Sequence, residues 1–154
     1  MHLSAYKNGD ADKRRFYETQ IMVEDGKHKE LTEQIIKAFY KVYNELGHGF
    51  LEKVYQNSLY IELKRMGLNV EPQKQIKVYY QGFEVGEYYP DMIVNESVIL
   101  ELKAAEAIVV EFENQVLNYL RATNIEVGLL LNFGVKPEVR RKVFANTNKK
   151  LKSA

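Results

Sequence analysis

The chain has 154 residues and a formal net charge of +1, and 45% of its residues are hydrophobic while 28% are charged. These values are ordinary for a single globular domain with one sizeable core. The chain has no cysteine, which excludes a disulfide framework and a thiolate metal site. No hydrophobic run approaches transmembrane length, and the first residues lack the pattern of a signal peptide, so we expect a cytoplasmic protein without membrane contact.

The first third of the chain is predicted to form a polar arm and two helices. Residues 1–29 show little apolar periodicity, and we expect a flexible arm with one short ordered piece at residues 16–23. Apolar residues at helical spacing predict a helix over residues 31–46, which Gly47 would end. A second helix is predicted over residues 49–66, where leucine and tyrosine recur every four residues.

The rest of the chain is predicted to alternate strands and helices. The expected elements are strands at residues 75–80 and 84–88, two strands carrying Asp91 and Glu101 that continue this meander, a helix at residues 111–122, a buried strand at residues 127–132, and a short helix after Pro137. This order is typical of an α/β protein. We therefore expect a mixed central β-sheet flanked by helices.

The strongest functional signal lies in the hairpin predicted to turn at residues 95–97. The residues on either side of the turn are mostly apolar, and this turn would place Asp91 directly opposite Glu101. Because side chains alternate between faces along a strand, Glu101 and Lys103 share one face while the neighbouring leucines point into the core. The sequence therefore predicts that two carboxylates and one amine converge.

Two carboxylates in such a pair would lie about 5 Å apart and would repel each other unless one is protonated or a cation bridges them. Mg²⁺ suits a site made of few carboxylates, water and phosphate oxygens, with Mn²⁺ as a substitute. We predict that Asp91 and Glu101 bind this metal and that Lys103 faces the metal-bound water and a phosphate. The alternative for a lone pattern of this kind is an exposed strand face with ordinary surface salt bridges.

Three residues on the predicted helices add to this pattern. Glu52 lies in the first turn of the second helix, where the helix dipole favours a carboxylate. Gln115 and Tyr119 are four residues apart and therefore share one helix face. Taken alone, they would be a well-placed N-terminal acid, a surface glutamine and a tyrosine at the edge of the core.

Together these residues resemble the GxxExxY protein family of the PD-(D/E)XK nuclease superfamily, over residues 31–144. The similar motifs are Gly49, Glu52 and Tyr55 for the family, Pro90, Asp91, Glu101 and Lys103 for the superfamily core, and Gln115 with Tyr119 for the Gln-x-x-x-Tyr motif of RecB-type exonucleases. The resemblance implies a restriction-endonuclease-like domain, which we place at residues 30–145.

The resemblance also implies a metal-dependent nuclease that acts on nucleic acid. It does not supply the substrate, which we expect to be DNA. Glu52 would reach the metal directly or through water, as a third metal ligand beside Asp91 and Glu101. Gln115 and Tyr119 would bind the nucleic-acid backbone or support the site. The products would carry a 5′ phosphate and a 3′ hydroxyl.

The C-terminal end of the chain is basic. Residues 136–154 hold seven Lys or Arg residues against the single acid Glu138. These cations could contact phosphates, which would make binding depend on salt, or they could form a solubilising tail, which we place at residues 146–154.

Two other functions stay open at this point. The first is a catalytically silent module that binds nucleic acid or protein on the nuclease fold, although the intact carboxylates and lysine argue against it. The second is a phosphodiesterase for small nucleotides, which would cut dinucleotides as fast as long strands. The sequence does not predict whether the substrate is DNA or RNA, nor does it predict the oligomeric state. A homodimer would suit a small nuclease that acts on a duplex.

Overall fold

The computed structural model describes residues 28–150 of the chain. The elements follow in the order α2 (Lys29–Leu46), α3 (Glu52–Arg65), β1 (Val70–Pro72), β2 (Ile76–Tyr80), β3 (Phe83–Tyr88), β4 (Met92–Val94), β5 (Val98–Lys103), α4 (Val110–Arg121), β6 (Val127–Phe133), β7 (Pro137–Val143) and the short 3-10 helix η2 (Asn146–Asn148). The short ordered piece predicted at residues 16–23 lies outside the described residues, as does most of the predicted arm.

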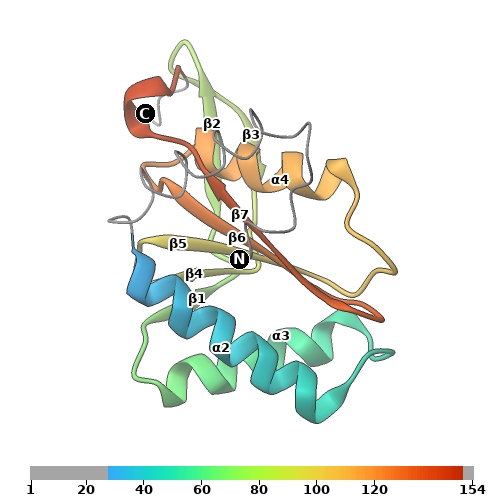
Figure 1. Ribbon diagram of the computed structural model, residues 1–154. Helices are drawn as coiled ribbons and strands as arrows, with labels where there is room; N and C mark the ends of the chain where they lie inside the picture. The colour runs from blue at the N-terminus through green and yellow to red at the C-terminus, as the bar shows by residue number, and fades with distance from the viewer. Residues whose placement is uncertain (1–27, 151–154) are drawn as a thin grey trace, which may run out of the picture.

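A five-stranded sheet in the order β1-β4-β5-β6-β7 forms the central layer (Figure 1). Strands β5 and β6 are parallel, because α4 carries the chain from one to the other, and the other neighbours are antiparallel. Helices α2 and α3 lie on one side of this sheet, and α4 lies on the other with the β2-β3 hairpin. The expected mixed sheet flanked by helices is confirmed.

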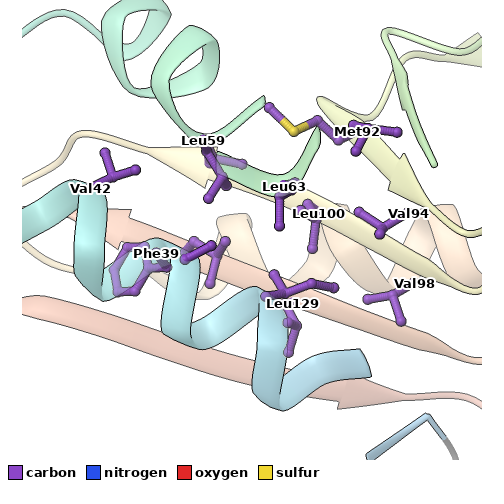
Figure 2. Close-up of a cluster of buried hydrophobic side chains, with 14 of the residues drawn as sticks. Phe39, Val42, Leu59, Leu63, Met92, Val94, Val98, Leu100 and Leu129 are labelled. Carbon is purple, nitrogen blue, oxygen red and sulfur yellow. The ribbon is translucent and has the colours of Figure 1, made fainter. Parts of the chain in front are cut away.

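The larger hydrophobic core fills the space between the sheet and the two N-terminal helices (Figure 2). Helix α2 contributes Phe39 and Val42, and α3 contributes Leu59 and Leu63, at the spacings that place side chains on one helix face. Leu100 from β5 packs into this cluster, as the predicted alternation of faces requires. This core fixes α3 against the strands that carry the candidate site.

A second, smaller cluster lies on the opposite face of the sheet, under α4 and the β2-β3 hairpin. Helix α4 approaches β6 closely at Gly128, where an added Cβ would lie 2.6 Å from Cγ1 of Val116. Ile99 on β5 belongs to this cluster, and so does Tyr119 on α4. The face of β5 that bears Glu101 and Lys103 therefore looks toward α4.

The predicted continuous meander is wrong. Strands β2 and β3 pair only with each other, in a separate two-stranded sheet, and β4 pairs instead with β1, a three-residue strand that the sequence pattern did not predict. Strand β3 is exposed along most of its length, so it lacks the two buried faces of a strand inside the main sheet. The hairpin contributes to the core mainly through Ile76, Val78 and Tyr88, which pack into the smaller cluster.

The short helix predicted after Pro137 is also wrong, because these residues form strand β7, antiparallel to β6. Val139 and Val143 both pack against the larger core cluster. Their spacing of four residues places two side chains on the same face of a helix, and it does the same on a strand. Pro137 suits either element, since proline is accepted at the first residue of a helix and at the start of an edge strand.

Candidate active site

Asp91 and Glu101 meet at the open end of the β4-β5 hairpin. The strands pair Met92 with Leu100 and Val94 with Val98, so the same register places Asp91 opposite Glu101, as predicted. The backbone N–H of Asp91 donates to Oε1 of Glu101 at 3.4 Å. The two acids come from residues ten apart in the chain, and the hairpin brings them together.

Both acids are buried, with 8% of Asp91 and 4% of Glu101 exposed. Burial and then the charge of Asp91 raise the pKa of Glu101 to about 8, although Lys103 acts in the opposite direction. Burial also raises the pKa of Asp91, against the backbone hydrogen bond from Leu102. Two carboxylates so close in a poorly hydrated place favour one shared proton or a bound cation.

Lys103 completes the predicted trio on the same face of β5. Its Nζ lies 3.5 Å from Oε2 of Glu101, and its side chain is only 18% exposed. The ammonium also sits 4.7 Å from the centre of the Phe112 ring, on α4. Phe112 was not among the predicted site residues. Its cation–π contact holds the ammonium group of Lys103 near the two acids.

The carboxylate of Asp91 accepts three hydrogen bonds from the protein. The backbone N–H of Leu102 donates to Oδ2 at 2.7 Å, and the side-chain amides of Gln56 and Gln73 donate to Oδ1 at 2.9 and 3.4 Å. Neither glutamine was predicted. The only sequence signal for Gln56 is its place one helical turn after Glu52, while Gln73 gave none.

The loop between α2 and α3 explains the spacing of the glycine, glutamate and tyrosine motif. Gly49 has a φ of 109°, a backbone conformation that residues other than glycine rarely adopt. The Tyr55 hydroxyl donates to the carbonyl of Gly47 at 2.6 Å and accepts from the N–H of Phe50 at 3.2 Å. The tyrosine thus closes the loop that leads into α3.

Glu52 is the first residue of α3, so it lies in the first turn of this helix, as predicted. Burial raises its pKa, the charge of Asp91 raises it further, and Lys103 lowers it. The charges of these two residues act on Glu52, so all four predicted catalytic residues belong to one electrostatic cluster. Three acids around one lysine leave a local excess of negative charge.

Gln115 and Tyr119 lie behind Glu101 on α4. Nε2 of Gln115 donates to the Tyr119 hydroxyl at 2.7 Å. Burial, followed by the charge of Glu101, raises the pKa of Tyr119, and a hydrogen bond with Glu101 acts in the same direction. The tyrosine stays protonated, so this chain of contacts supports Glu101.

The donor set fits a divalent cation, although no ready-made cluster of three metal-binding side chains occurs among residues 28–150. Asp91 and Glu101 offer the oxygen ligands that Mg²⁺ prefers. Burial raises the pKa of both acids, and a bound cation would favour their ionised forms. Glu52 could add a third carboxylate from α3.

The basic segment is partly tied into the fold. Lys142 forms an ion pair with Glu113 at 2.6 Å, and Arg140 forms one with Glu138 at 3.2 Å. Nζ of Lys149 donates to two backbone carbonyls of the loop after α4, at 2.7 and 2.8 Å. These three cations are therefore engaged with the protein itself.

Comparison with known proteins identifies the class. A family model described as the PD-(D/E)XK nuclease superfamily matches residues 29–142. This chain belongs to the PD-(D/E)XK nuclease superfamily. The narrower GxxExxY resemblance stays a prediction.

No curated protein matches the chain. Among solved structures, the one titled "Crystal structure of SSO0001" superposes with a TM-score of 0.51 and 16% sequence identity, over 82% of this chain and 62% of that chain. The chain thus spans less than two thirds of that protein's length. At this identity the similarity concerns the fold alone.

None of the helices between residues 28 and 150 is long and apolar enough to cross a membrane.

Proposed function

We propose that this protein is a nuclease that uses Mg²⁺ to hydrolyse phosphodiester bonds in nucleic acid, with DNA as the favoured substrate. The observation that carries the proposal is the buried pair of Asp91 and Glu101 with Lys103 beside it, at 3.5 Å from Glu101. Membership of the nuclease superfamily supports the same chemistry.

Each residue has a role that follows from its position. Asp91 and Glu101 would hold the metal, and Glu52 would assist directly or through water. A divalent cation in such a site lowers the pKa of bound water and polarises the phosphate. Lys103 would orient the attacking water and stabilise negative charge on the phosphoryl oxygens, as a positioned cation does. Gln115 and Tyr119 would keep Glu101 in place.

A silent binding module on the same fold is the competing proposal. Burying two acids side by side costs free energy, because each loses hydration and repels the other. A module that only needed the fold would be more stable with apolar or amide side chains at these positions. The acids therefore favour a protein that uses them with a cation.

The experiment is cleavage of labelled single-stranded and double-stranded DNA and RNA with Mg²⁺, Mn²⁺ or EDTA. We expect cutting with either metal, loss of cutting in EDTA, and loss in Asp91→Ala and Glu101→Gln. Glu106→Gln is the matched control, because this exposed acid lies just after β5 and outside the site. A folded protein that binds nucleic acid and cuts none of the substrates would support the silent module instead.

A further inference from the structure

The carboxylate of Asp91 has most of its hydrogen-bonding capacity already engaged. An ionised carboxylate offers about four lone-pair positions, two on each oxygen. Gln56 and Gln73 both donate to Oδ1, while Leu102 donates to Oδ2. These three bonds leave one lone pair on Oδ2, and the Asp91 carboxylate also has a side-chain hydrogen bond with Glu101.

Gln73 donates two hydrogen bonds to Asp91. Its backbone N–H donates to the carbonyl oxygen of Asp91 at 3.1 Å, and its side-chain amide donates to Oδ1 at 3.4 Å. These two contacts come from the same residue, directly after β1. They link the edge strand β1 to the start of β4, beyond the strand pairing itself.

The backbone of Gln73 is strained, with a φ of 53°. Residues with a side chain avoid this region, and glycine is the usual occupant. Gln81, Asn95 and Glu96 share a positive φ and lie in the turns of the two β-hairpins, and Gln73 lies in the turn that follows β1. At Gln73 the strained backbone is combined with a side chain that reaches Asp91, as is typical of functional sites.

Gln56 and Gln73 also share an open pocket of about 240 Å³ beside Asp91. The remaining walls are Lys53, Asn57, Tyr60, Pro72 and Met92. Neither glutamine belongs to a hydrophobic core cluster. Changes to these amides can therefore be tolerated without disturbing the packing of the protein.

We propose that Gln73 and Gln56 are positioning residues that hold Oδ1 of Asp91, so that Oδ2 is presented to the divalent cation. This inference rests on the proposed function. A carboxylate fixed in advance loses less conformational freedom when the metal binds, which strengthens binding. Partners behind a metal ligand orient it in this way, and removing one typically weakens metal binding by tenfold or more.

The test is Mn²⁺ binding without nucleic acid, measured by isothermal titration calorimetry, together with the melting temperature of the metal-free protein. In Gln73→Gly we expect the dissociation constant for Mn²⁺ to rise about tenfold. The melting temperature should not fall, because glycine accepts the positive φ without strain. A purely structural glutamine would lose stability and leave metal affinity unchanged.

Three further variants complete the experiment. Gln56→Ala should weaken Mn²⁺ binding as Gln73→Gly does, and Asn57→Ala, from the same pocket wall, should not. Asp91→Ala should abolish binding and so identify the site. Unchanged or tighter Mn²⁺ binding in both glutamine variants would overturn the positioning role and leave the nuclease proposal standing. A wild-type protein that binds no Mn²⁺ would overturn both.

Discussion

Tyr55 illustrates how one residue joins the core to the candidate site. Its ring stacks on Phe133 with centroids 4.3 Å apart, while its hydroxyl closes the loop between Gly47 and Phe50. Glu52 begins α3 directly after that loop. The position of one acid of the site therefore depends on a hydroxyl group that would not itself touch substrate.

Replacing Tyr55 by Phe separates these two tasks, because the ring remains and only the hydroxyl is lost. We expect the free energy of unfolding to fall by about 1 kcal/mol, since the carbonyl and N–H lose their partner. Cleavage should fall further than this loss of stability explains, because Glu52 is less well placed. Tyr60→Phe, in the same helix, is the control. A folded Tyr55→Phe protein that cuts at the wild-type rate would contradict the role of the loop.

Single residues of the site were predictable where a local pattern marks them. Asp91, Glu101 and Lys103 followed from strand alternation around one turn, and the structure places them as that pattern requires. Gln73 could not be found in this way. Its bond to Asp91 joins residues 18 apart and depends on β1, which is too short to show an alternating pattern.

At the scale of elements, the contact between α4 and β6 decides how Phe112 and Tyr119 approach β5. The contact is close because Gly128 has no side chain. The strand β6 was predictable from its continuous apolar run, which is typical of a strand buried on both faces. Strand β7 was not, because a four-residue apolar spacing fits a helix and a strand equally.

Gly128→Ala tests this contact. The new Cβ would lie 2.6 Å from Cγ1 of Val116, so we expect overpacking to lower the free energy of unfolding by about 1–3 kcal/mol. Gly86→Ala is the matched control, since a Cβ on that strand glycine meets no atom within 4 Å. Chemical denaturation measures both variants. The double variant with Val116→Ala should regain part of the loss, and full stability in Gly128→Ala alone would refute the close contact.

Across the whole molecule, the buried acids make stability depend on pH. The pKa of Glu101 is about 8 in the fold, and the ordinary value for the unfolded chain is 4.5. Between these values the folded state binds more protons than the unfolded state, so stability is full below pH 4.5 and is lost as pH rises toward 8. The carboxylate pair lowers the stability of the fold at neutral pH. A divalent cation bound between the two acids should therefore raise this stability by a large amount.

We therefore expect the metal-free protein to lose stability from about pH 5 to pH 8, by about 1.4 kcal/mol for each unit by which the pKa is raised. Glu101→Gln should flatten this slope, because the amide does not titrate. Mg²⁺ should restore stability to the wild type at pH 8 and not to the variant. Melting temperatures in EDTA and in Mg²⁺ across this range measure both effects, and equal slopes for wild type and variant would contradict the assignment.

The most direct test of the nuclease proposal is the rate of Mg²⁺-dependent DNA cleavage by Lys103→Ala at saturating metal. Lys103 lies beside the acids without being a metal ligand, so its loss should spare the fold and Mn²⁺ binding. We predict a rate at least about 100-fold below wild type, as for other positioned groups that stabilise transition-state charge. Lys64→Ala, an exposed lysine of α3 that lies outside the pocket beside Asp91, should cut normally. Cleavage by Lys103→Ala at the wild-type rate would contradict the proposed site.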